Sequence, residues 1–272
     1  MDRLLFGISG LPLGTENSKF TYKTGIAYLK EIGLDAMELP FVRSINITKK
    51  NREGVLNSKK ENNFYLSAHG SYFINLNSDD MEKQEKSLER IVKGAEALKK
   101  VEGKSLIFHA GFYLKDSKEE TYNTIKENLL KLPYIGVDYR LETTGKATQF
   151  GDLEELVSLC KEVSSCKLCI DFSHLHARYN GALKEYDDFA RILTYVGDNL
   201  GDDGLNDMHI HISGINYGLK GEKNHLPLAE SDFNYNACMK AFKDFNIKGC
   251  VICESPVLEN DSLLLKNIYE NL

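Results

Sequence analysis

The sequence predicts an α/β fold, a single (β/α)8 TIM barrel, because short apolar runs alternate with longer stretches of helical periodicity. Eight such pairs fit into 272 residues, with no linker rich in Pro or Ser between them. Regular alternation implies parallel strands, and a barrel matches this length better than an open doubly wound sheet of about five to seven strands. We therefore expect one domain over residues 1–272.

The expected strands are short and rich in apolar or β-branched residues, and they span residues 3–9, 34–39, 64–69, 104–110, 137–143, 166–171, 206–213 and 249–254. The expected helices lie between them and span residues 21–32, 47–61, 79–101, 117–131, 152–163, 186–199, 231–245 and 261–271. Two helix starts carry capping residues, Asp152 with Glu155 in one and Asp261 in the other.

The composition is that of an ordinary soluble globular protein, with 42% hydrophobic and 27% charged residues. This excludes a disordered, collagen-like or coiled-coil chain. No apolar run reaches the ~18 residues of a membrane span, and the start lacks the pattern of a signal peptide, so we expect a cytoplasmic protein with no membrane partner. The net charge of −6 gives no overall attraction to nucleic acid, so such a partner would require a basic patch or bound cations.

Six cysteines include two pairs at the spacing of half a zinc knuckle, Cys166 with Cys169 and Cys250 with Cys253. Both pairs lie in expected buried strands, where residues three apart point to opposite faces. Neither pair is therefore expected to chelate one ion. With Cys160 and Cys238 on expected helices, we interpret the set as reduced core thiols.

Polar residues gather where the expected strands end, which in a (β/α)8 barrel is the edge that forms the active site. Six of the seven histidines lie at or just after a strand end, and the seventh, His225, follows in the loop after the seventh strand. The strand-end residues are Glu38, His69, His109, Glu142, Asp171, His174, His209, His211 and Glu254.

Three of these carboxylates, Glu142, Asp171 and Glu254, would repel one another if they meet at one rim. Each pair a few ångströms apart costs roughly 2–4 kcal/mol at an effective dielectric near 20. Protonation would relieve this repulsion, but the neighbouring imidazoles complete a donor set suited to zinc, manganese or ferrous iron. The donors exceed what one tetrahedral ion needs, so we expect more than one metal. Clustered divalent ions are a common means of hydrolysing phosphate esters.

Six stretches stand in the order and at the separations of one known family: LSAHGSYFINL, LIFHAG, LETTGKATQFGDLEEL, CIDFSHLHA, HISG followed by GEKNHLPL, and ICESP. They resemble endonuclease IV, the zinc-dependent apurinic/apyrimidinic endonuclease family. The resemblance covers the chain from the third strand to its end. It implies a (β/α)8 barrel and a hydrolase that uses zinc to cleave the phosphodiester 5′ to an abasic site during DNA repair.

The resemblance also implies three zinc ions, which would be held by His69, His109 and Glu142; by Glu142, Asp171, a histidine of the seventh strand and Glu254; and by His174 and His225. For the seventh strand we prefer His211 and keep His209 as a deeper residue or alternative ligand. Glu142, Asp171 and Glu254 are the implied catalytic residues. The family's Asp-Arg-His is replaced by a stretch from Glu222 to His225, so the third ion uses Glu222 or lacks a carboxylate. Two to three ions are therefore expected, with Mn²⁺ as an alternative for part of the zinc.

The implied partner is double-stranded DNA with abasic sites. Tyr72 stands where the family carries an aromatic residue that enters the minor groove, and Arg43 is a similar probe in the loop after the second strand. Alternatively, Tyr72 packs on the barrel rim. We expect a monomer. Other readings are a sugar or sugar-phosphate isomerase or epimerase with a divalent metal, because xylose-isomerase-like barrels share this architecture, and a non-catalytic barrel that binds a partner through the same mouth.

Overall fold

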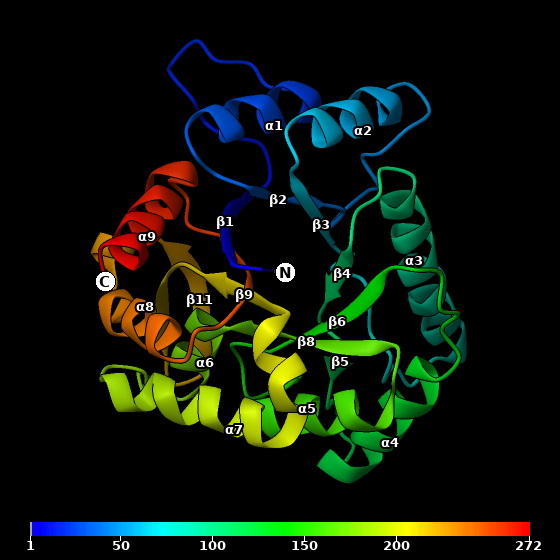
Figure 1. Ribbon diagram of the computed structural model, residues 1–272. Coiled ribbons are helices and arrows are strands. Elements are labelled where there is room, and N and C mark those ends of the chain that lie inside the picture. The colour runs from blue at the N-terminus through cyan, green and yellow to red at the C-terminus, as the bar shows by residue number, and fades with distance from the viewer. Residues whose placement is uncertain (1) are drawn as a thin grey trace.

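A computed structural model describes residues 2–272, which form a closed barrel of eight parallel strands in the order β1-β12-β9-β8-β6-β4-β3-β2. Helices form an outer ring around these strands (Figure 1). The fold expected from the alternating pattern is confirmed. The barrel strands are β1 (Leu4–Ser9), β2 (Ala36–Pro40), β3 (Tyr65–His69), β4 (Ser105–Phe108), β6 (Asp138–Glu142), β8 (Cys166–Asp171), β9 (Met208–Ile212) and β12 (Gly249–Cys253).

The ring consists of α1 (Tyr22–Glu31), α2 (Arg52–Glu61), α3 (Met81–Lys99), α4 (Lys118–Leu129), α5 (Leu153–Glu162), α7 (Tyr186–Asn206), α8 (Tyr235–Asp244) and α9 (Glu259–Asn271). Asp152 and Glu155 form the expected capping box at the start of α5. Side chains on the inner faces of these helices pack on the outer faces of the strands, which is why the strand residues that face the helices are apolar.

Most boundaries lie within four residues of the expected ones, and three differences at helix ends have a local cause. Helix α2 begins at Arg52 rather than residue 47, because the Asn51 side chain accepts from the Thr48 backbone and holds a turn there. Helix α7 extends to Asn206 across a kink at Gly201, which has a φ of 68°. Asp261 does not cap α9; it lies inside the first turn, where it accepts from the Leu228 backbone at 2.8 Å.

Several short elements on the upper rim were not predicted. The segment after β8 folds into the short helix α6 (Phe172–Arg178), and the region after β9 forms an antiparallel hairpin of β10 (Gly214–Gly218) and β11 (Gly221–Leu226). A second small pair joins β5 (Gly111–Phe112) to β7 (Gln149–Phe150), and a 3₁₀ turn, η1 (Leu228–Glu230), follows the hairpin. The expected loop after the seventh barrel strand is therefore mostly a hairpin.

The start of β12 needs a glycine. Gly249 has a φ of 130°, and a Cβ there would lie 1.9 Å from the Met208 carbonyl oxygen of the neighbouring strand. This close approach sets the register in which β12 pairs with β9 and β1 and closes the barrel.

The six cysteines are free within residues 2–272. Cys250 belongs to the cluster inside the barrel, whereas Cys253 packs in the layer between strands and helices, as their opposite faces on β12 require. No helix of the described chain is long and apolar enough to cross a membrane.

Candidate metal centre

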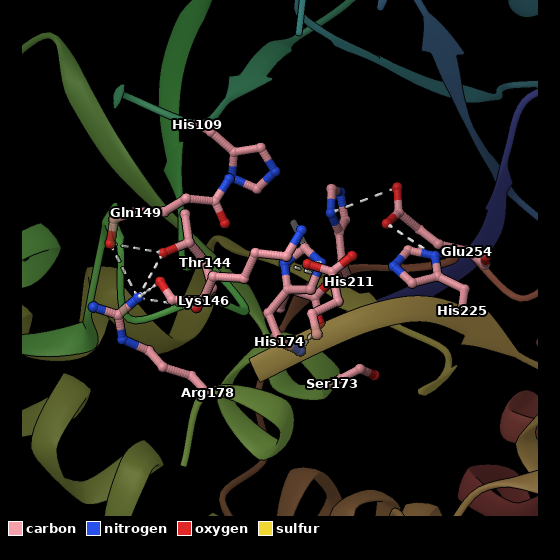
Figure 2. Close-up of polar contacts among 12 residues, drawn as sticks. His109, Thr144, Lys146, Gln149, Ser173, His174, Arg178, His211, His225 and Glu254 are labelled. Carbon is pink, nitrogen blue, oxygen red and sulfur yellow. Dashed lines mark hydrogen bonds and ion pairs between the residues drawn. The ribbon is translucent and has the colours of Figure 1, made fainter. Parts of the chain in front are cut away.

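The strand-end residues meet at the mouth of the barrel. His69, Glu142 and Asp171 end β3, β6 and β8, while His109 and Glu254 follow β4 and β12 by one residue. Because all eight strands are parallel, these ends share one rim. All of these residues except Asp171 line a cavity of about 250 Å³, together with His174, Glu222 and His225. Figure 2 shows His109, His174, His225 and Glu254 near one another in this region.

The donor atoms fall into three groups, in each of which they lie within 4.8 Å of one another. The groups are His69, His109 and Glu142; Glu142, Asp171, His211 and Glu254; and Asp171, His174 and His225. The first two coincide with two of the ligand sets that the resemblance implies. In the third, Asp171 joins the two expected histidines. Glu142 and Asp171 each belong to two groups, so the three positions are adjacent.

Three of the histidines have one ring nitrogen next to a backbone carbonyl. The Nδ1 atoms of His69, His174 and His225 lie 2.9, 3.0 and 3.1 Å from the carbonyl oxygens of Gly70, Thr143 and Glu254. A carbonyl can only accept, so Nδ1 donates, and in the neutral ring it is Nε2 that carries the lone pair. This is how metal-ligating histidines are usually held, with the second nitrogen hydrogen-bonded to the protein.

Glu142 lies at the centre of the imidazoles. Its Oε2 atom is 2.9 Å from His69 Nε2 and 3.5 Å from His109 Nε2, and its Oε1 atom is 3.1 Å from His211 Nδ1. Burial opposes its charge, but His109 and His211 outweigh burial and hold the pKa of Glu142 well below its usual range. Glu142 is therefore a fully buried anion positioned to bridge cations.

The protonation of the other groups follows from burial and from these charges. Burial disfavours charge on His69 and His174, but Glu142 raises the pKa of His69 to about 9, and Asp171 with Glu142 raises that of His174 to about 9. Burial dominates at His109 and lowers its pKa to about 4. Burial also raises the pKa of Asp171 to about 6, with His174 opposing the shift. Without a metal, the protonated imidazoles of His69 and His174 thus balance the negative charge of the carboxylates.

The residues present fit a divalent cation. The Oδ2 atom of Asp171 and the Nδ1 atom of His109 are buried and make no hydrogen bond within residues 2–272. A buried carboxylate oxygen without a donor is costly unless a cation faces it. Imidazole nitrogens mixed with carboxylate oxygens suit zinc, manganese or iron, so the site matches the metals expected from the sequence.

The hairpin brings the two remaining candidate ligands to the mouth. Glu222 and His225 lie on β11, and the backbone nitrogen of Glu222 donates to the Gly145 carbonyl at 2.9 Å. The Glu222 carboxylate is 3.6 Å from His174 Nε2. His225 therefore belongs to the third donor group, and Glu222 lies beside that group without being a member of it.

His209 lies deeper than the cavity. Its Nε2 atom is 2.9 Å from Glu38 Oε2, and its Nδ1 atom is 3.1 Å from the Cys250 sulfur. A donor group also links His209 with His211 and Cys169, but all three are buried beneath the mouth. This position corresponds to the deeper residue weighed in the sequence, while His211 reaches the upper groups.

The two DNA-contact candidates lie on adjoining rim loops. Tyr72 is 64% exposed, lines the cavity, and has its ring centroid 6.0 Å from that of His69. Its backbone nitrogen donates to the Val42 carbonyl at 3.1 Å, next to the exposed Arg43. Tyr72 is therefore accessible at the rim and does not pack away from solvent.

Sequence reasoning missed Lys146 and Gln149, which also line the cavity. Arg178 Nη1 fastens their loop, donating to the Thr144 hydroxyl at 2.9 Å and to the Lys146 carbonyl at 2.6 Å (Figure 2). Lys146 is half-buried and has no carboxylate within 4.0 Å among the described residues. The stretch TTGKATQF contained this lysine, but nothing in its spacing showed that the loop turns inward.

Comparison with known proteins places the fold. A profile of the family described as xylose isomerase-like TIM barrel matches residues 26–267. The chain belongs to this family. Among solved xylose isomerase-like barrels, it is similar to a D-tagatose 3-epimerase-like protein, with a TM-score of 0.71, 17% identity, and coverage of 98% of this chain and 96% of that one. It is similar to endonuclease IV of Thermus thermophilus, with a TM-score of 0.68, 17% identity, and coverage of 98% of both chains.

Two sequence relatives extend the comparison. An uncharacterized protein of Methanocaldococcus jannaschii is 45% identical over 99% of this chain and 98% of its own length. A protein of Campylobacter concisus named as a probable endonuclease 4 is 25% identical over 75% of this chain and 76% of its own. The resemblance to endonuclease IV seen in the sequence is thus confirmed, within the wider family of xylose isomerase-like TIM barrels.

Proposed function

We propose that this barrel is a metal-dependent hydrolase of the endonuclease IV type, which cleaves the phosphodiester 5′ to abasic sites in double-stranded DNA. The observation that carries the proposal is the sharing of Glu142 and Asp171 among three adjacent donor groups. Such an arrangement suits two or three divalent ions side by side, zinc first and manganese second. The similarity to a protein named as a probable endonuclease 4 supports the same function.

Bound ions would supply the activation of water and the stabilisation of charge on the phosphate oxygens. The residues of the chain orient the reaction. Glu142 and Asp171 would hold neighbouring cations, and Glu254 would complete the group that contains His211. Among the described residues that line the cavity, Lys146 is the one lysine or arginine, and with no carboxylate within 4.0 Å of it there, its ammonium can contact a phosphate. Tyr72 and Arg43 flank the entrance, where a duplex would lie.

The surplus of acid also fits this reaction. A mouth with several carboxylates repels a phosphodiester until cations occupy it, and the net charge of −6 adds no attraction elsewhere. DNA binding by this chain therefore depends on the metal centre and on a few rim cations. We infer that chelation weakens both binding and cleavage.

A second candidate is a sugar or sugar-phosphate epimerase or isomerase with one divalent ion. One observation favours it: Glu142, Asp171, His211 and Glu254 form a complete four-donor group without the other histidines. The fold neighbour named as D-tagatose 3-epimerase-like is consistent with it, and a cavity of about 250 Å³ holds a small sugar. The two candidates differ in metal count and in substrate.

The test is a nicking assay on a duplex with one tetrahydrofuran abasic-site analogue, run with zinc, with manganese and with chelator. We expect cleavage 5′ to the lesion that chelator abolishes and added metal restores, with two to three ions bound per chain by elemental analysis. An intact duplex matched in sequence is the control. Turnover of a sugar panel by a protein that carries one ion and leaves abasic DNA uncut would favour the epimerase.

A further inference from the structure

A buried polar chain lies directly beneath the cavity, with Glu38 at its centre. Glu38 is on the inner face of β2, its side chain is fully buried, and it belongs to none of the donor groups. Its Oε2 atom accepts from the Ser67 hydroxyl at 2.9 Å and lies 2.9 Å from His209 Nε2. Its Oε1 atom lies 3.1 Å from His211 Nε2.

The direction of each hydrogen bond can be assigned from the groups that face it. The thiol of Cys250 lies 3.1 Å from His209 Nδ1 and donates to it, so the proton of His209 is on Nε2 and points at Glu38. Ser67 also donates to Glu38. Both of these donors therefore reach Oε2, which leaves Oε1 to face His211.

These contacts favour one tautomer of His211. Its Nε2 atom and Glu38 Oε1 have no hydrogen-bond partner among the described residues, and they lie 3.1 Å apart, so each can satisfy the other. In the neutral ring that would bind a metal, with its proton on Nε2, the Nδ1 atom carries the lone pair, and this atom lies 3.1 Å from Glu142 Oε1. Nδ1 is thus the atom presented to the group of Glu142, Asp171 and Glu254.

The group that lies behind His211 is charged, whereas the groups behind three other histidines are neutral. His69, His174 and His225 are held by neutral backbone carbonyls, whereas His211 is backed by a full negative charge. A carboxylate behind an imidazole fixes the ring and makes its other nitrogen a stronger electron donor. An ion bound through His211 would therefore be held by a stronger donor nitrogen than the ions bound through the other histidines.

We propose that Glu38 is a positioning residue of the metal centre, which sets the tautomer of His211 and strengthens the central metal position selectively. His209 and Ser67 donate to the other oxygen of Glu38, Oε2, which does not face His211. The inference concerns the affinity for metal, so it applies whether the site acts on DNA or on a sugar.

The test is metal titration of the full chain after chelator treatment, comparing the parent with Glu38→Gln. Zinc is titrated against a chromogenic chelator, and Co²⁺ is titrated by its visible absorption. We expect one binding step of Glu38→Gln to weaken by about 10- to 100-fold, as for loss of other outer partners of ligating histidines. The remaining steps should stay within about threefold, and the Co²⁺ spectrum of the weakened step should change shape.

Ser67→Ala is the matched control, because it removes a donor to the same carboxylate without facing a metal ligand, and it should weaken every step by less than about threefold. Glu38→Asp keeps the charge one methylene further away and should give an intermediate loss in the same step. Circular dichroism and thermal unfolding in chelator report whether each variant folds. If Glu38→Gln does not fold, the metal titration of Glu38→Asp tests the inference in its place. Unchanged steps, or steps weakened equally, would overturn the inference. Because no DNA is present, failure here is distinct from failure of the nicking assay.

Discussion

The two ends of the barrel differ in whether their buried charged groups are hydrogen-bonded within the chain. At the base, Arg140 is 2% exposed and its guanidinium is fully engaged: it donates to the Ser105 hydroxyl at 2.8 Å, the Leu168 carbonyl at 3.1 Å and the Asp207 carboxylate at 2.9 Å. Lys167 adds a second cation 2.7 Å from Asp207. At the mouth, Asp171 Oδ2 and His109 Nδ1 are buried without any hydrogen bond in the described part of the chain.

The difference separates a structural ion pair from a binding site. The base satisfies its charges with groups of the same chain, so nothing further is required there. The mouth collects carboxylates around imidazoles and leaves Asp171 Oδ2 and His109 Nδ1 without a hydrogen bond, although His174 Nδ1 lies 3.3 Å from Asp171 Oδ2. This is the arrangement expected when a cation completes the set. Cavity size would mislead, since the cavity beside Arg140 has about 550 Å³ and the one at the mouth about 250 Å³.

Removing the charge of Glu142 is expected to have the largest effect on function. Glu142→Gln keeps the shape but deprives two donor groups of their shared anion. We expect abasic-site cleavage to fall by about a thousandfold or more, equivalent to about 4 kcal/mol, together with loss of bound metal. Elemental analysis and single-turnover nicking measure this. Glu162→Gln, on the exposed end of α5, is the control and should cleave normally; an unchanged rate in Glu142→Gln would remove it from the mechanism.

At the base, the corresponding change should affect stability alone. Arg140→Met leaves Asp207 partly buried beside Lys167 and removes four side-chain hydrogen bonds, so we expect a loss of about 3–5 kcal/mol in the free energy of unfolding. Urea denaturation measures the loss. The metal content of the folded fraction should equal that of the parent protein. If Arg140→Met is as stable as the parent protein but loses metal, the base of the barrel contributes to metal binding and the distinction between the two ends is wrong.

The pH dependence of the metal-free protein should also originate at the mouth. His69 and His174 have folded-state pKa values of about 9, above the ordinary value of 6.5. The folded state therefore binds more protons than the unfolded state between these values, and the stabilisation, at most about 3 kcal/mol per histidine, is lost as pH rises from 6.5 through 9. Thermal unfolding in chelator should show a Tm that falls over this window. Bound metal replaces the protons and should flatten the profile.

The smallest expected effect concerns Lys146. If its ammonium contacts a phosphate, Lys146→Ala should weaken binding to the abasic duplex by up to about tenfold and lower the salt dependence by roughly one ion, with metal content unchanged. Fluorescence anisotropy over a range of salt concentrations measures both. Lys161→Ala, on the exposed face of α5 near the base, is the matched control. Equal affinity and equal salt slope in the two variants would leave Lys146 without a role in binding.

Much of the rim could be predicted because a barrel turns sequence position into spatial position. His69, Glu142 and Asp171 are far apart in the chain, but each ends a strand, and parallel strands end together. Lys146 and Glu222 follow no such rule. Their places depend on Arg178 and on the pairing of β10 with β11. The monomeric state, the cytoplasmic location and the single domain over residues 1–272 stay predictions.

The sequence by itself determined the eight βα units, the direction of the strands and the residues at their ends, since these depend on periodicity within short segments. Only the tertiary structure decided which ring nitrogen of each histidine is free and that His209 lies below His211 against Glu38. It also brought Asp171 into contact range of the third group. These features depend on atoms that lie up to 171 positions apart in the chain, as Glu38 and His209 do, and meet only when the barrel closes.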